Sequence, residues 1–150
     1  MSYTLENLPL ARVISQIESS NLPDAIRFEP AIYQKFATAS PHRMIRSIQL
    51  MHDCDLATAN MLASTSWGLY QIMGYNLIDL GLDVTFFQYL DNSNLQKVFF
   101  LKFVNDHNIN FTTVEVYTDQ EKGVRFAETY NGSDAYYLTM RKTIKSLTGE

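Results

Sequence analysis

Hydrophobic residues recur three or four positions apart over most of the chain, which is the pattern of amphipathic helices. Residues that cap helices or occupy their first turn precede several of these stretches. The helices predicted in this way are 10–17 with Asn7 as a cap, 30–36 after Glu29, a helix from Ser40-Pro41 to Met51, 56–62 capped by Asp55, 66–80 ending at Gly81, 83–90 starting at Asp83, 95–107, and 133–147. We therefore expect an all-α fold, or α with a minor β element, made of many short helices.

Composition and charge narrow the class of protein. The chain has 150 residues, 46% of them apolar and 19% charged, with no internal repeat and no linker-like stretch, so we expect one globular domain. No uninterrupted run of about 18 apolar residues is present, so no stable membrane insertion is expected. The formal net charge of -4 argues against a nucleic-acid partner, because phosphates are neutralised by Lys and Arg.

The N-terminus and the cysteine count bear on where the protein is made. The first ten residues carry one acidic and no basic side chain, which is not the pattern of a secretory signal peptide. Cys54 is the only cysteine, so no internal disulfide can form, and synthesis in the cytoplasm is the simpler expectation. The three histidines are scattered, and neither a metal site nor a cofactor is expected.

Glu18 is the strongest candidate for acid chemistry. It follows Ile14 by four positions and Ile17 by one, so it lies on or beside the apolar side of the first predicted helix. Burial and the negative end of a helix both disfavour a carboxylate. Both effects raise the pKa of a carboxyl above about 4.3, which suits a general acid in glycoside cleavage. The alternative is a solvated glutamate in the last turn of a helix.

Two further stretches carry polar residues in unusual settings. In Ser66–Gly74, Ser-Trp-Gly-Leu-Tyr-Gln-Ile-Met-Gly, most side chains are explained as core, with Ser66 as a helix cap. Gln71 does not fit that account, because an amide within an apolar run needs hydrogen-bond partners. Downstream, the Asn-Gly step of Tyr130-Asn131-Gly132 predicts a turn.

Glu18-Ser19, then Gly-Leu-x-Gln at 68–71, then Tyr130-Asn131 follow one another in this order along the chain. This order resembles the lysozyme-like superfamily, which includes goose-type lysozymes and lytic transglycosylases. The longer Ser66–Gly74 wording, followed by Phe126-Ala127 and Tyr130-Asn131-Gly132, is most similar to the phage-associated N-acetylmuramidase family. The resemblance covers most of the chain and implies a lysozyme-like, multi-helix, single catalytic domain over 1–150.

The resemblance assigns roles to residues that match the family's motifs. Glu18 is then expected to be the catalytic acid. Gln71 is expected to line the sugar groove near that acid, and Ser66 and Tyr75 to reach the same groove.

The resemblance also bears on the C-terminal half of the chain. It implies that Tyr130 approaches the catalytic carboxyl and that Asn131 shapes or contacts the substrate site. It favours a helix over 111–117, a segment whose β-branched composition and partial alternation are otherwise typical of a strand.

A second catalytic carboxylate is expected at Glu29. It matches a Phe-Glu pair that follows the acid in the muramidase family, although the chain between the two is shorter here. An equal alternative is a helix N-cap or an ion pair with Arg27. Asp24 and Asp134 are weaker candidates, and an inverting or a retaining outcome stays open.

The function that the resemblance implies is hydrolysis of the β-1,4 bond between N-acetylmuramic acid and N-acetylglucosamine in peptidoglycan. The protein would be a phage endolysin or a virion-associated lysozyme that acts on the bacterial cell wall. Two alternatives stay open: a lytic transglycosylase, which forms anhydro-muropeptides, and a catalytically silent glycan-binding module. The expected partner is the peptidoglycan glycan strand, and no oligomeric state is predicted.

Overall fold

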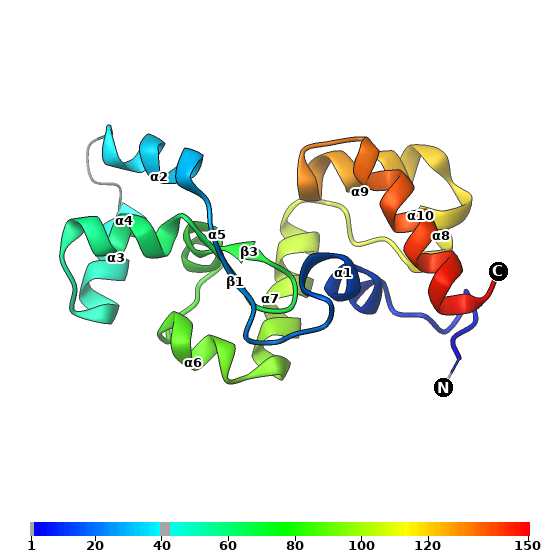
Figure 1. The fold of residues 1–150 in the computed structure, drawn as a ribbon, viewed down its shortest axis with the longest axis horizontal. Coiled ribbons are helices and arrows are strands. Elements are labelled where there is room, and N and C mark those ends of the chain that lie inside the picture. The colour runs from blue at the N-terminus through cyan, green and yellow to red at the C-terminus, as the bar shows by residue number, and fades with distance from the viewer. Residues whose placement is uncertain (1, 40–42) are drawn as a thin grey trace. The chain divides into compact units, whose positions relative to one another are not determined.

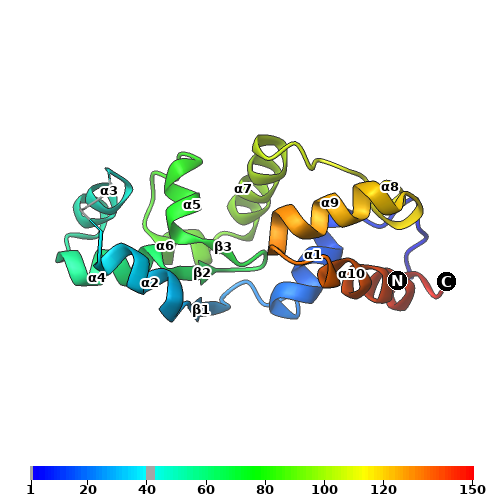
Figure 2. The same cartoon turned by 90° about the horizontal axis from the view of Figure 1, so that it is seen from above.

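The computed structural model describes residues 2–39 and 43–150, and the chain forms two compact units. The described residues up to Asn21 and Phe100–Glu150 make up the terminal unit, whereas Leu22–Phe99 make up the central unit. The described part of the chain contains ten helices and one three-stranded sheet (Figures 1 and 2). The prediction of a mostly helical fold with a minor β element is therefore confirmed.

The terminal unit consists of helices. Its elements are α1 (Leu10–Ser19), the end of α7 (Ser93–Asp106), α8 (Thr113–Thr118), α9 (Gln120–Asn131) and α10 (Ala135–Thr148). Helix α10 contacts α1, α8 and α9, as Figure 1 shows at the C-terminal end of the chain. The side chains at the centre of this packing are almost fully buried: Val13, Ile14, Val116, Phe126, Met140 and Ile144.

The ambiguous segment 111–117 is helical from Thr113 onwards, so the prediction of a helix there is confirmed. A reciprocal cap explains the outcome. The Thr112 hydroxyl accepts the Glu115 N–H at 3.1 Å, and the Glu115 carboxylate accepts the Thr112 N–H at 2.8 Å. Such a capping box satisfies two amide groups that the first turn of a helix leaves unpaired.

The central unit combines short helices with the sheet. Its elements are β1 (Ile26–Phe28), α2 (Pro30–Ala37), α3 (Arg43–His52), α4 (Leu56–Ala63), β2 (Thr65–Trp67), β3 (Ile72–Met73), α5 (Gly74–Asp79), α6 (Phe86–Leu90) and the start of α7. The strands pair antiparallel in the order β1-β2-β3, as Figure 2 shows. Trp67 stacks on Phe86 with ring centroids 4.8 Å apart, which fixes the sheet against the helices.

The prediction of one helix over 66–80 is wrong. Ser66 and Trp67 pair with Met73 and Ile72 as two strands of a hairpin, and the helix begins only at Gly74. The chain reverses because Gly68 (φ 79) and Gln71 (φ 51) both adopt left-handed backbone conformations, which a right-handed helix does not contain.

Helix starts were predicted with mixed success. Asp55 caps α4 as predicted and accepts the Thr58 N–H at 2.8 Å. Asn7 is not the cap of α1, because its side chain accepts the Thr4 N–H instead. The helix predicted from Asp83 begins at Phe86. No element was predicted at β1 or α9, and a helix was predicted where β2 and β3 lie. The predicted start at Ser40-Pro41 lies outside the described residues.

Candidate active site

Glu18 lies half-buried in the last turn of α1, as predicted. The helix ends directly after the Glu18-Ser19 pair because Ser20 (φ 53) and Asn21 (φ 62) turn left-handed. Asn21 is held in this turn: its N–H donates to the Ser15 carbonyl, and its Oδ1 accepts the Ser15 hydroxyl at 3.0 Å. The backbone that follows Glu18 is thus held in one conformation at the C-terminal end of α1.

The hydroxyl of Tyr136, in the first turn of α10, donates a hydrogen bond to Glu18 Oε1 at 2.7 Å. Tyr136 is buried, and this burial, followed by the Glu18 charge and the hydrogen bond, raises the pKa of its phenol far above the ordinary value of 10. The phenol therefore keeps its proton and acts as a donor toward the carboxyl.

Tyr136 was not among the predicted site residues. A signal for it exists in the sequence, because Tyr136, Met140 and Ile144 recur every four residues and so share one buried face. A phenol on such a face needs a hydrogen-bond partner. What the spacing cannot give is the identity of that partner, since Glu18 is 118 residues away in the sequence.

Tyr130 lies in the last turn of α9, and its ring belongs to an aromatic cluster in the terminal unit. The ring stacks on Phe126 (centroids 5.4 Å apart, interplanar angle 10°) and on Tyr136 (6.4 Å, 21°). Tyr130 is therefore placed beside the phenol that donates to Glu18. Asn131 is the exposed last residue of α9, and Gly132 (φ 83) ends the helix, so the predicted turn is confirmed.

Gln71 lies in the central unit, on the turn that joins β2 to β3. Its side-chain Nε2 donates to the carbonyls of Gly68 (2.9 Å) and Ala25 (3.2 Å). The amide nitrogen therefore faces two backbone carbonyls. The other polar atom of this half-buried side chain is Oε1, which is a hydrogen-bond acceptor. Within residues 2–39 and 43–150, no protein partner of that oxygen is recorded.

The remaining predicted residues of the central unit have their own contacts. Ser66 is buried in β2, and its hydroxyl contacts Met73 Sδ at 3.0 Å. Tyr75 is half-buried at the start of α5, with its ring edge-on to Phe36 at 5.6 Å. The role of Ser66 as a helix cap is wrong, because this residue lies in a strand.

Glu29 occupies the N-cap position of α2 and forms an ion pair with Arg27, whose Nε lies 3.2 Å from Oε1. Its side chain makes no capping hydrogen bond. The alternative of an ion pair with Arg27 is therefore confirmed. Because Arg27 is well exposed, this ion pair contributes little to the stability of the protein. Glu29 directly follows the last residue of β1.

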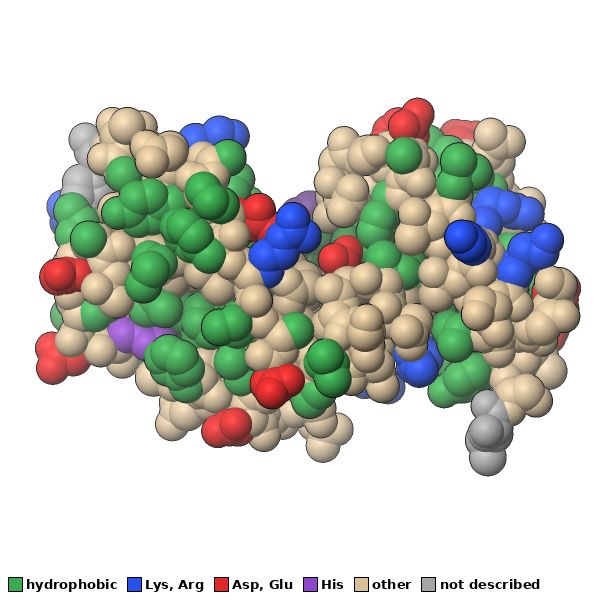
Figure 3. All heavy atoms as spheres, in the orientation of Figure 1, with side chains coloured by type: hydrophobic (Ala, Val, Ile, Leu, Met, Phe, Trp, Pro, Cys, Tyr) green, Lys and Arg blue, Asp and Glu red, His purple; other side chains and the backbone are tan. Residues whose placement is uncertain are grey.

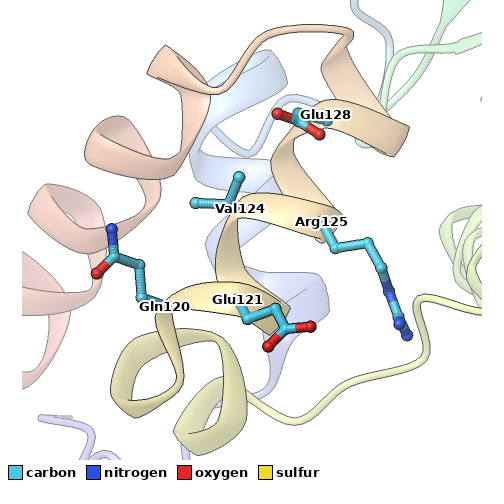
Figure 4. Close-up of a pocket in the computed structure, with 5 residues that line it drawn as sticks. All are labelled: Gln120, Glu121, Val124, Arg125 and Glu128. Carbon is cyan, nitrogen blue, oxygen red and sulfur yellow. The ribbon is translucent and has the colours of Figure 1, made fainter.

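The surface carries two hollows that are lined by residues other than the predicted site residues. In the terminal unit, a hollow of about 580 Å³ follows one side of α9, where Figure 4 shows Gln120, Glu121, Val124, Arg125 and Glu128 along the helix. In the central unit, hydrophobic side chains gather on one face (Figure 3), and a hollow of about 210 Å³ is lined by Phe28, Tyr33, Ala57, Thr58 and Met61.

Within 2–39 and 43–150, no three His, Cys, Asp or Glu side chains gather so that they could hold a metal ion. None of the helices in the same residues has the length and apolar character needed to cross a membrane.

The half-buried carboxyl of Glu18, at the end of α1, accepts a hydrogen bond from the buried Tyr136 hydroxyl, and glycoside hydrolases use such a side-chain carboxyl as a general acid. A family model of N-acetylmuramidases, named Muramidase, matches residues 13–146. The chain is also 31% identical over 140 residues to the endolysin of Enterobacteria phage PRD1, which covers 91% of each protein. No solved structure gives a significant match.

This protein belongs to the N-acetylmuramidase family. It is a glycoside hydrolase whose substrate is peptidoglycan, and it acts on the bacterial cell wall. The resemblance noted from the motifs of Glu18, Gln71 and Tyr130 is thereby confirmed at the level of the family.

Proposed function

We propose that this protein is a phage endolysin in which the whole chain acts as one catalytic domain and Glu18 is the general acid. The observation that carries the assignment of Glu18 is its hydrogen bond to the buried Tyr136 hydroxyl, 2.7 Å from Oε1. The similar PRD1 protein is named an endolysin, which supports the proposal that this protein acts in phage lysis. The net charge of -4 supports the absence of a nucleic-acid partner.

In the proposed reaction, protonated Glu18 donates its proton to the glycosidic oxygen as the bond to the leaving sugar breaks. Water attacks the anomeric carbon and gives one of its protons to a carboxylate, and the product is a reducing muramic-acid end. Glu18 becomes a carboxylate in this step. The Tyr136 hydroxyl binds that carboxylate more strongly than the neutral acid, since hydrogen bonds to charged groups are the stronger ones. The phenol thereby favours the state in which the proton has been transferred.

Substrate contacts are proposed for residues of both units. In the central unit, Gln71 Oε1 accepts a hydrogen bond from the glycan, from an acetamido N–H or a sugar hydroxyl, because the amide nitrogen is engaged by two carbonyls. Ser66 and Tyr75 are proposed to assist, and in the terminal unit Tyr130 and Asn131.

Glu29 is proposed as the second carboxylate, which positions the attacking water. Its ion pair with Arg27, whose Nε lies 3.2 Å from Oε1, gives the carboxyl of Glu29 a charged partner that supports this role. The inverting and retaining outcomes are separated by the anomeric configuration of the first product, measured by NMR.

The test of the function is wall lysis by the purified protein and by Glu18→Gln. Parent protein should clear a suspension of purified peptidoglycan, whereas Glu18→Gln should lose this activity with a nearly unchanged melting temperature. Substantial activity in the folded variant would overturn the assignment of Glu18. Mass spectrometry of the fragments decides the chemistry: reducing ends support hydrolysis, and anhydro-muropeptides would mean a transglycosylase.

A further inference from the structure

Gln96, in the first turn of α7, is a polar side chain that is 0% exposed. Such a side chain needs partners for its donors and its acceptor. Its Oε1 accepts the Leu69 N–H at 2.7 Å, and its Nε2 donates to the Pro23 carbonyl at 2.9 Å. The carbonyls of Tyr89 and Leu90 at the end of α6 lie 3.3 and 3.2 Å from the same nitrogen.

These partners connect Gln96 to both supports of Gln71. Leu69 lies within the 68–71 turn, whose Gly68 carbonyl accepts one hydrogen bond from Gln71 Nε2. Pro23 lies two residues before Ala25, whose carbonyl accepts the other. One buried amide thus holds the two backbone segments that in turn hold the Gln71 side chain.

Gly68 fits this arrangement in two ways. Its φ of 79 lies in the left-handed region, which favours glycine. A Cβ at this position would also overlap Oε1 of Gln96. The close approach of the Gln96 amide to the turn therefore requires a residue without a side chain at position 68.

We propose that Gln96 is a positioning residue for glycan binding, because it fixes the turn that aims Gln71 Oε1. Gln71 itself has a left-handed backbone (φ 51), which a residue with a side chain adopts only when its surroundings hold it there. Without Gln96, the turn and the Ala25 segment would be free to separate, and the amide oxygen of Gln71 would lose its fixed direction. The inference rests on the proposed glycan-binding role of Gln71.

The experiment is a double-mutant cycle on the full-length protein. Gln71→Ala, Gln96→Met and the double variant are compared with the parent for KM and kcat on solubilised, dye-labelled glycan strands. Gln71→Ala is expected to raise KM by about three- to tenfold, as for one hydrogen bond. Gln96→Met should raise KM by a similar factor alone, and by little when Gln71 is already Ala.

Additivity would overturn the inference. If Gln96→Met raises KM equally in both backgrounds, Gln96 acts on the fold in general, and the role of Gln71 stands without it. If Gln71→Ala leaves KM unchanged, the glycan-binding role of Gln71 fails and the inference with it. The proposed function is tested separately, by the loss of lysis in Glu18→Gln. If that loss is seen while the Gln71 and Gln96 variants keep their lysis, the proposed function stands even though the roles of Gln71 and Gln96 fail.

Gln96→Glu is a second variant, which tests the inference even if Gln96→Met does not fold. It keeps the shape of the side chain. A protonated carboxyl can accept from Leu69 N–H and donate to the Pro23 carbonyl, whereas a carboxylate can only accept. Relative to the parent at each pH, its KM should approach the parent value in acid and rise toward neutral pH. A KM ratio that does not change with pH, or loss of the folded state in both Gln96 variants, would show a purely structural role and overturn the inference.

Discussion

Removing the Tyr136 hydroxyl tests the hydrogen bond on which the assignment of Glu18 depends. In Tyr136→Phe, the ring that stacks near Tyr130 is retained, and only the donor to Glu18 Oε1 is lost. A hydrogen bond contributes about 1 kcal/mol between neutral groups and about 1.5–3 kcal/mol to a charged group. The difference, about 0.5–2 kcal/mol, acts only after Glu18 has given up its proton. It corresponds to a loss of about 2- to 30-fold in kcat.

The pH dependence gives a second readout. The lost donor favoured the carboxylate, so the protonated acid persists to higher pH in the variant. The alkaline limb of the activity profile should therefore move to higher pH, measured as the initial rate of lysis at constant ionic strength.

Tyr137→Phe is the matched control. Tyr137 is the next residue of α10 and is also buried, and its hydroxyl accepts from Arg141 Nη1 at 3.3 Å rather than contacting Glu18. The control should keep the parent kcat and profile. Equal losses in the two variants, or an unchanged kcat and profile in Tyr136→Phe, would refute the proposed role of the phenol.

Two further predictions concern the central unit. A Cβ on Gly74 would overlap the Leu62 carbonyl and crowd Phe86 and Trp67, so Gly74→Ala should lower the free energy of unfolding by about 1–3 kcal/mol in urea denaturation; a parent-like midpoint would contradict the packing. Burial lowers the pKa of His52 from its ordinary value of 6.5, so the stability it contributes is complete above pH 6.5 and is lost as the pH falls through the lowered value. The urea midpoint should fall on acidification below pH 6.5, and His52→Gln should weaken this dependence; an equal fall in the variant would exclude His52 as its source.

Most of the helices could be predicted from the sequence because their signals are local. The apolar spacing of residues 10–17 predicts α1, and the Asp55 cap places the start of α4 correctly. The failure over 66–80 has a physical cause: apolar periodicity does not record that Gly68 and Gln71 take left-handed conformations. The turn that contains them is bound through the Leu69 N–H by Gln96, which lies 27 residues further along the chain.

The site residues also divide into those that local sequence signals indicate and those that only a distant partner identifies. Glu18 could be proposed from its helix position and from its motif, and the family follows from the order of the motifs. Tyr136 and Gln96 lie outside the motifs that carry the resemblance to the family. Each is identified by a partner far away in the sequence, Glu18 for one and Leu69 with Pro23 for the other.

The sequence by itself thus determined the helical class and the family, and it put Glu18 forward as the acid, because side-chain periodicity, caps and short motifs are properties of neighbouring residues. The tertiary structure decided which hydroxyl binds Glu18 and which buried amide holds the turn of Gln71. A buried polar group has to find partners wherever the chain brings them, and that choice is made only when distant segments pack together.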